Sequence, residues 1–118
     1  LSAAHLRLHA TYIERMHWLE CLKRYDRPHV FMYLDPPYWQ TEGYGVDFPF
    51  TEYMDMAEAM RTMKGKALLS INDHPDIRKV FEGLPMERTS INYTVGGGSK
   101  PAKRHELIVW NWGGATGR

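Results

Sequence analysis

Two candidates for buried strands constrain the fold of this 118-residue chain more than any other feature. The residues from Val30 to Leu34 form a continuous apolar run without alternation of polarity, which is typical of a strand buried on both faces of a parallel sheet. The residues from Lys66 to Ile71 are a second candidate for a buried strand. Because parallel strands need crossover connections, we expect helices between the strands, packed on the faces of the sheet.

The first 25 residues allow two interpretations. Residues 8–13 nearly alternate in polarity and suit a short strand, and the apolar residues from Trp18 to Tyr25 recur at helical spacing. The alternative is one helix from Ser2 to Tyr25. We favour a strand followed by a helix, because Thr11, Tyr12 and Ile13 are neighbours with high β-propensity.

Two further helices are expected. Thr51 is a candidate N-cap for a helix that ends at Gly65, and its apolar stripe is interpreted as core filling rather than an interface. A second helix opens at Pro75 and stops at Gly83. The stripes consist of Tyr53, Met56, Ala57, Met60 and Met63 on the first helix and of Ile77, Val80 and Phe81 on the second.

The last third of the chain changes character. Met86 to Val95 and Glu106 to Trp112 are β-rich runs without a helix between them, so they are predicted to form an antiparallel hairpin with a long tip. The order of elements predicts a single α/β domain over residues 1–118. Its expected fold is a partial Rossmann-like one, with a mostly parallel sheet, helices on the faces of the sheet and a C-terminal antiparallel hairpin.

Composition excludes several classes of protein. Fifteen Lys and Arg balance fourteen Asp and Glu, so any affinity for nucleic acid must come from a local patch. A single cysteine, Cys21, rules out an internal disulfide and suits the cytoplasm, and nothing in the sequence suggests a bound metal. No apolar run approaches the roughly 20 residues of a membrane span, and we expect no membrane partner.

The tetrapeptide Asp35-Pro36-Pro37-Tyr38 ends the first apolar run. In a parallel sheet, chemistry gathers at the carboxyl ends of the strands, and this tetrapeptide lies at one of them. A carboxylate and two proline carbonyls form a compact set of acceptors that suits an amino group, and Tyr38 offers a ring for stacking on a flat base. The alternative is an ordinary turn, since Asp and Pro are common turn residues.

A second polar segment follows the strand ending near Ile71. Ser70, Asn72 and Asp73 are candidates for lining a base pocket, and the competing interpretation, given equal weight, is that Asn72 or Asp73 caps the following helix. His74 is interpreted as a surface residue rather than a base.

The expected hairpin tip contains a basic cluster of Lys100, Lys103 and Arg104 in a glycine-rich frame. These side chains are candidates for contacts with DNA phosphates, which would position the protein without reading sequence. A solvated loop is the alternative.

Three stretches, YLDPPY, LLSINDHP and ELIVWNW, together resemble the Dam-like class of adenine-specific DNA methyltransferases, over about Arg7 to Trp112. The resemblance implies a methyltransferase fold and transfer of a methyl group from S-adenosylmethionine to the N6 amine of an adenine flipped out of double-stranded DNA. By the same resemblance, Asp35 and the carbonyl of Pro36 accept hydrogen bonds from the amine, and Tyr38 stacks on the base. The implied source is a bacterial or phage cytoplasm, as in restriction-modification.

The sequence also departs from this class. The class has a glycine-containing cofactor motif and a target-recognition insert, whereas the first 34 residues contain no glycine. We therefore expect a C-terminal catalytic portion whose other half is missing or comes from another chain, and the edge of the strand from Val30 to Leu34 should be bare. The alternatives are a catalytically silent remnant, a weak nucleic-acid-binding piece, or a methyltransferase acting on RNA or on a protein amide.

Overall fold

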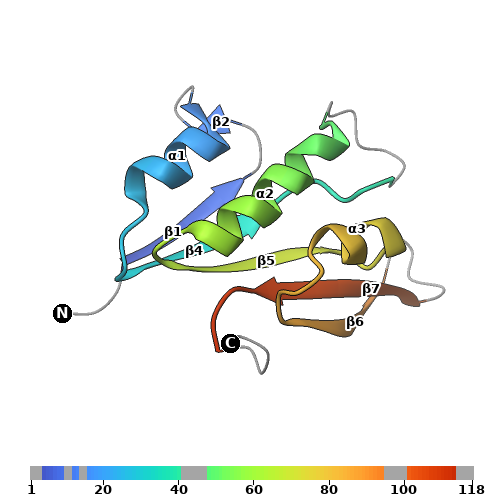
Figure 1. Cartoon of the computed structure of the whole chain (residues 1–118). Helices are drawn as coiled ribbons and strands as arrows, with labels where there is room; N and C mark the ends of the chain where they lie inside the picture. The colour runs from blue at the N-terminus through green and yellow to red at the C-terminus, as the bar shows by residue number, and fades with distance from the viewer. Residues whose placement is uncertain (1–3, 10–11, 14–15, 41–47, 95–100, 114–118) are drawn as a thin grey trace.

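A five-stranded sheet is the frame of the computed structural model, which describes residues 4–9, 12–13, 16–40, 48–94 and 101–113 (Figure 1). Together with the helices the sheet makes a mixed α/β domain. A separate antiparallel pair joins β2 to β3. The strands, in the order of the sheet, are β1 (Ala4–His9), β4 (Val30–Asp35), β5 (Lys66–Asn72), β7 (Pro101–Trp110) and β6 (Met86–Thr94), and the small pair is β2 (Tyr12–Ile13) and β3 (Met16–His17).

The sheet is mixed, not mostly parallel as the sequence led us to expect. β4 lies parallel to both β1 and β5, and β7 lies antiparallel to both β5 and β6. The helical crossovers between β1, β4 and β5 explain the parallel half. The hairpin of β6 and β7 produces the antiparallel half, because its two strands run in opposite directions and both join the same sheet.

Two expectations for the N-terminal region were wrong. The first strand is Ala4–His9 rather than residues 8–13, and Tyr12–Ile13 belongs to the small pair. The edge of β4 is also not bare, because β1 pairs with it along its whole length, from Ala4 opposite Val30 to His9 opposite Asp35. A single helix from Ser2 to Tyr25 is excluded as well, because strands precede Trp18.

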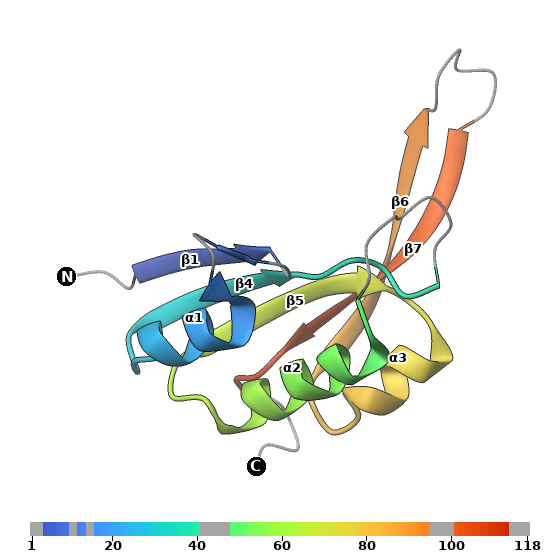
Figure 2. The same ribbon diagram turned by 90° about the horizontal axis from the view of Figure 1, so that it is seen from above.

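The described helices all lie on one face of the sheet, whereas the sequence led us to expect them on both faces (Figures 1 and 2). They are α1 (Trp18–Tyr25), α2 (Phe50–Thr62) and α3 (Pro75–Val80), with α2 in contact with both of the others. We call the sheet face without a described helix the open face.

The helix ends differ in detail from the sequence expectations. α2 begins at Phe50 after Pro49 and has no side-chain cap, so Thr51 lies inside the first turn, and the helix ends at Thr62 rather than at Gly65. Gly65 serves instead as a close-packed backbone position: a Cβ there would lie 2.6 Å from the carbonyl oxygen of Val30 and 2.7 Å from that of Arg27.

The hydrophobic core lies between the helices and the sheet. Met32, Leu34, Leu69, Leu107 and Val109 project from the strands and are at most 1% exposed. The core-filling interpretation of the α2 stripe is confirmed for Tyr53, Met56, Ala57 and Met60, which are all buried, while Met63 lies just beyond the helix and packs against the core.

The C-terminal hairpin is confirmed, with a longer second strand than expected. β7 begins at Pro101 and not at Glu106, because residues read as a loop continue the pairing to Thr94. The far half of the hairpin rises beyond the sheet, away from the helices (Figure 2). None of the described helices is of the length and apolarity that crossing a membrane requires.

Candidate functional site

Asp35 is the last residue of β4, so the predicted tetrapeptide begins where this strand ends. Burial alternates along β4, with Val30, Met32 and Leu34 buried toward the helices and the residues between them half-buried. Asp35 therefore belongs to the open face. Pro36 is buried, and Pro37 and Tyr38 are half-buried, with Tyr38 packed against the core. This places a carboxylate at the carboxyl edge of the sheet on an accessible side.

Tyr53 of α2 holds the turn from the helix side. Its hydroxyl donates a hydrogen bond to the carbonyl of Pro37 at 2.6 Å, and its side chain is only 1% exposed. The ring also lies within an aromatic cluster, 5.0 Å from Phe48, 5.8 Å from Phe50 and 5.9 Å from Trp39 between ring centroids. The Pro37 carbonyl is thus fixed by the protein.

Asn72 of β5 holds the same turn from the neighbouring strand. Its Oδ1 accepts a hydrogen bond from the backbone N–H of Trp39 at 2.8 Å, and its Nδ2 donates to the backbone carbonyl of Trp39 at 2.9 Å. This reciprocal pair mimics one step of sheet pairing and spans 33 residues of sequence. Asn72 therefore positions the tetrapeptide and does not cap the helix that follows.

Ser70 lies beside Asp35 across the sheet. The register pairs Leu34 with Leu69, so the next residues, Asp35 and Ser70, are level with each other on the open face. Ser70 is 6% exposed and is the only buried polar or charged side chain among the described residues. The structure thus brings two of the predicted site residues, Asp35 and Ser70, to one place.

Glu106 of β7 joins these residues, and the sequence interpretation missed it. It is the pairing partner of Asn72, and its neighbour Leu107 is fully buried toward the helices, so Glu106 faces the open side. Burial raises the pKa of the Glu106 carboxyl, and the nearby charge of Asp35 raises that pKa further. The sequence did contain a signal for Glu106: it is the one acid among the alternate residues Glu106, Ile108 and Trp110, which share a face of the strand.

Asp73 does not join this group. Its side chain is 11% exposed and forms ion pairs with Arg78 at 2.7 Å and with Arg88 at 3.1 Å. The hydrogen bond from Arg78 lowers the pKa of Asp73, although burial opposes that shift, and the charges of Arg78, Arg88 and His105 lower the pKa further. Asp73 therefore ties α3 to β6.

His74 caps α3, a role that the sequence interpretation gave to Asn72 or Asp73. Its Nδ1 accepts a hydrogen bond from the backbone N–H of Asp76 at 3.0 Å, and its Nε2 lies 3.1 Å from Oε1 of Gln40. His74 is half-buried and links the start of α3 to the chain just beyond Trp39. These contacts give it a structural role.

The three basic candidates belong to the hairpin. Lys100 lies outside the described residues. Lys103 and Arg104 are part of β7, where their backbones pair with Asn92 and Ile91, and their side chains lie outside the described part. This first part of β7 belongs to the half of the hairpin that rises away from the helices (Figure 2).

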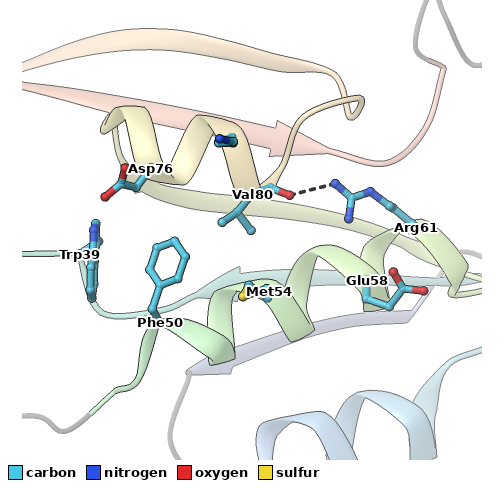
Figure 3. A pocket seen from close by; sticks show the side chains of 8 residues that line it. Trp39, Phe50, Met54, Glu58, Arg61, Asp76 and Val80 are labelled. Atoms are coloured by element: carbon cyan, nitrogen blue, oxygen red, sulfur yellow. Dashed lines mark hydrogen bonds between the residues drawn. The ribbon is translucent and has the colours of Figure 1, made fainter.

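A pocket of about 590 Å³ opens between α2 and α3, on the side of the sheet opposite to Asp35 (Figure 3). Trp39 and Phe50 stand at one end, with ring centroids 4.8 Å apart, and Asp76 lies above them. At the other end Arg61 donates a hydrogen bond to the carbonyl of Val80 and another to that of Glu82. The indole N–H of Trp39 is buried and has no partner among the described residues.

The charges around this pocket do not select one kind of ligand. Glu58 and Asp76 oppose Arg61 and Lys79 along its lining. Trp39, the residue that follows the tetrapeptide, forms part of the aromatic end of the pocket. The pocket therefore lies next to the turn, on its helix side. Elsewhere, the described residues contain no group of three His, Cys, Asp or Glu side chains that could hold a metal ion.

No family model matches this chain, and neither does any curated protein.

Proposed function

We propose that this chain is the amine-binding part of a site-specific, adenine-specific DNA methyltransferase of the N6 type, with a partial Rossmann-like methyltransferase fold. The observation that carries the proposal is the double support of the tetrapeptide. Tyr53 fixes the Pro37 carbonyl from one side and Asn72 fixes the Trp39 backbone from the other, so Asp35 stands at the end of β4 on a rigid turn. Rigid support of this kind is what a positioned catalytic group requires.

The chemistry of the turn suits an exocyclic amine. Asp35 accepts one hydrogen bond from the amine, the Pro36 carbonyl accepts the second, and the exposed part of Tyr38 stacks on the base. These two acceptors draw electron density toward the amine nitrogen and orient its lone pair. Such positioning and electrostatic stabilisation need no covalent bond between the enzyme and the base.

The residues of this chain do not fit a full binding site for S-adenosylmethionine, the methyl donor that the resemblance implies. Glycines after a strand allow a nucleotide-like cofactor to approach the backbone closely. The strand beside β4 is β1, which ends at His9, and the first glycine in the sequence is Gly43. We therefore expect little or no binding of S-adenosylmethionine to this chain; micromolar affinity by calorimetry would contradict this expectation.

The shape of the hairpin supports DNA as the partner. β6 and β7 rise on the side of the sheet away from the helices, which is also the side to which Asp35 belongs (Figure 2). A duplex approaching the open face would meet the basic segment of β7, where Lys103 and Arg104 are candidates for phosphate contacts.

The test compares two duplexes that each carry one unpaired base, either adenine or purine, which lacks the amine. Binding of the 118-residue chain is measured by fluorescence anisotropy at fixed salt concentration. Loss of two hydrogen bonds should weaken binding of the purine duplex roughly tenfold or more. Asp35→Ala should remove the preference for adenine.

Asp55→Ala is the matched control, because it removes an exposed carboxylate from α2, on the far side of the sheet. It should leave the preference intact. Equal binding of the two duplexes by the unchanged chain would overturn the proposal and leave a nucleic-acid-binding piece. An RNA duplex with the same unpaired adenine, bound more tightly than DNA, would move the substrate to RNA.

A further inference from the structure

Glu106 stands out because it is an acid at the site for which the proposed amine chemistry has no use. The reaction as described needs acceptors for the amine, and Asp35 and a proline carbonyl provide them. A second carboxylate near Asp35 would only add repulsion. We therefore looked for another group of the substrate that the Glu106 side chain could bind.

The register of the sheet fixes where Glu106 lies. Asp35 is level with Ser70 on β5, and Ser70 pairs with Ile108 on β7, two residues from Glu106 on the same face. Two strand spacings separate the backbones of β4 and β7, roughly 10 Å. The β5 residues between them on this face are Ser70, level with Asp35, and Asn72, the pairing partner of Glu106. The Asn72 amide is bonded to the backbone of Trp39, so the two acids border the space above the small Ser70 side chain.

The environment favours the uncharged form of Glu106. Its side chain is half-buried, and both burial and the charge of Asp35 raise its pKa. A carboxyl group that keeps its proton has an O–H to donate, which an ionised one lacks. At a pH below this raised pKa, the end of the sheet offers an acceptor on β4 and a donor on β7.

An adenine edge presents the complementary pair. The amine donates, and the ring nitrogens on either side of C6 accept, N1 on the Watson–Crick edge and N7 on the Hoogsteen edge. We propose that the Glu106 carboxylic acid donates a hydrogen bond to one of these ring nitrogens while Asp35 holds the amine, so that the two acids together select adenine. This inference rests on the proposed function and adds a specificity-determining residue to it.

The first test uses the unchanged chain and altered bases. Duplexes with one unpaired adenine, purine, 1-deazaadenine or 7-deazaadenine are compared by fluorescence anisotropy. Loss of one hydrogen bond should weaken binding of one of the two deaza bases roughly fivefold relative to adenine. If both deaza bases bind as well as adenine while purine binds weakly, the role of Glu106 is refuted and the proposed function stands. If purine also binds equally, the proposed function itself fails.

The second test changes Glu106. Glu106→Leu should make the sensitive deaza base and adenine bind equally while adenine remains preferred over purine, because Asp35 is unchanged. Glu87→Leu is the matched control: Glu87 pairs with Ile108 and shares this face, but it lies one strand further from Asp35. A Glu106→Leu chain that still discriminates against the deaza base would overturn the inference.

The third test measures the binding of the adenine duplex as a function of pH. A purely structural role of Glu106 would not make this binding depend on the protonation of its carboxyl group. Binding of adenine should weaken as the pH rises through the raised pKa of Glu106, whereas Glu106→Gln, whose amide can donate at any pH, should show no such step. The other titratable or charged residues at this end of the face are Asp35, Glu87, and His9 and Arg104 by register position. They remain in Glu106→Gln, so any step they cause remains there too. An identical step in both proteins would contradict the proposal.

Discussion

Replacement of Asn72 by alanine tests whether the tetrapeptide is held by the neighbouring strand. The amide makes two hydrogen bonds with the backbone of Trp39, of 2.8 and 2.9 Å, in a half-buried setting. A hydrogen bond of this kind contributes about 1 kcal/mol net, so Asn72→Ala should lower the free energy of unfolding by about 2 kcal/mol. Urea unfolding at 25 °C, followed by far-UV circular dichroism, measures this change.

Asn111 offers a matched control at the opposite end of β5. Its Oδ1 accepts a hydrogen bond from the backbone N–H of Ala67, and its Nδ2 donates to the carbonyl of Met60 at 3.0 Å and to that of Gly65 at 3.3 Å. Asn111→Ala should therefore cost a similar or larger free energy, about 2–3 kcal/mol, without touching the tetrapeptide.

Amide hydrogen exchange separates the two variants. The Trp39 amide should lose its protection in Asn72→Ala and keep it in Asn111→Ala, apart from the loss that follows from lower global stability. The preference for adenine over purine should likewise fall only in Asn72→Ala. A variant that loses less than 0.5 kcal/mol and retains protection at Trp39 would refute the claim that Asn72 holds the turn.

Two further predictions concern stability. Gly65→Ala should cost about 1–3 kcal/mol in urea unfolding, because the new methyl group meets the carbonyl oxygens of Val30 and Arg27; an unchanged midpoint would show that the backbone yields easily. Asp73→Asn should lower stability at pH 7 by about 1 kcal/mol, since its partner Arg78 is partly exposed and solvent screens the pair. Because the folded pKa of Asp73 lies below its ordinary value of 3.8, this difference should be present above pH 4 and vanish as the pH falls through the folded value, and a gap that persists in acid would contradict the sign.

The central elements were predictable because their signals are local. Continuous apolar residues identified β4 and β5, and Pro75 with the apolar residues at helical spacing identified α3. The same signals could not show that β1 lies beside β4, since pairing across a sheet depends on a partner distant in sequence. The run from Pro101 to His105 was read as a loop because three glycines precede it and proline begins it, yet pairing with β6 extends the strand.

The candidate site likewise has parts that local sequence predicts and parts that depend on distant residues. The location of Asp35 followed from the end of an apolar run, which is local information. The role of Asn72 was not predictable, because its partner lies 33 residues away and local sequence offered only a helix cap. Glu106 was overlooked because it was read only as the first residue of a β-rich run, and its proximity to Asp35 arises only from the order of strands.

The one-sided placement of the helices has a consequence for how this chain can change over evolutionary time. The strand residues that hold the fold together, such as Leu34 and Leu107, point toward the helices, whereas Asp35 and Glu106 point the other way. Substitutions on the open face can therefore change the chemistry of that face while the packing of the core is kept. Along each strand, residues that stabilise the core alternate with residues on the open face, so each set can change while the other is kept.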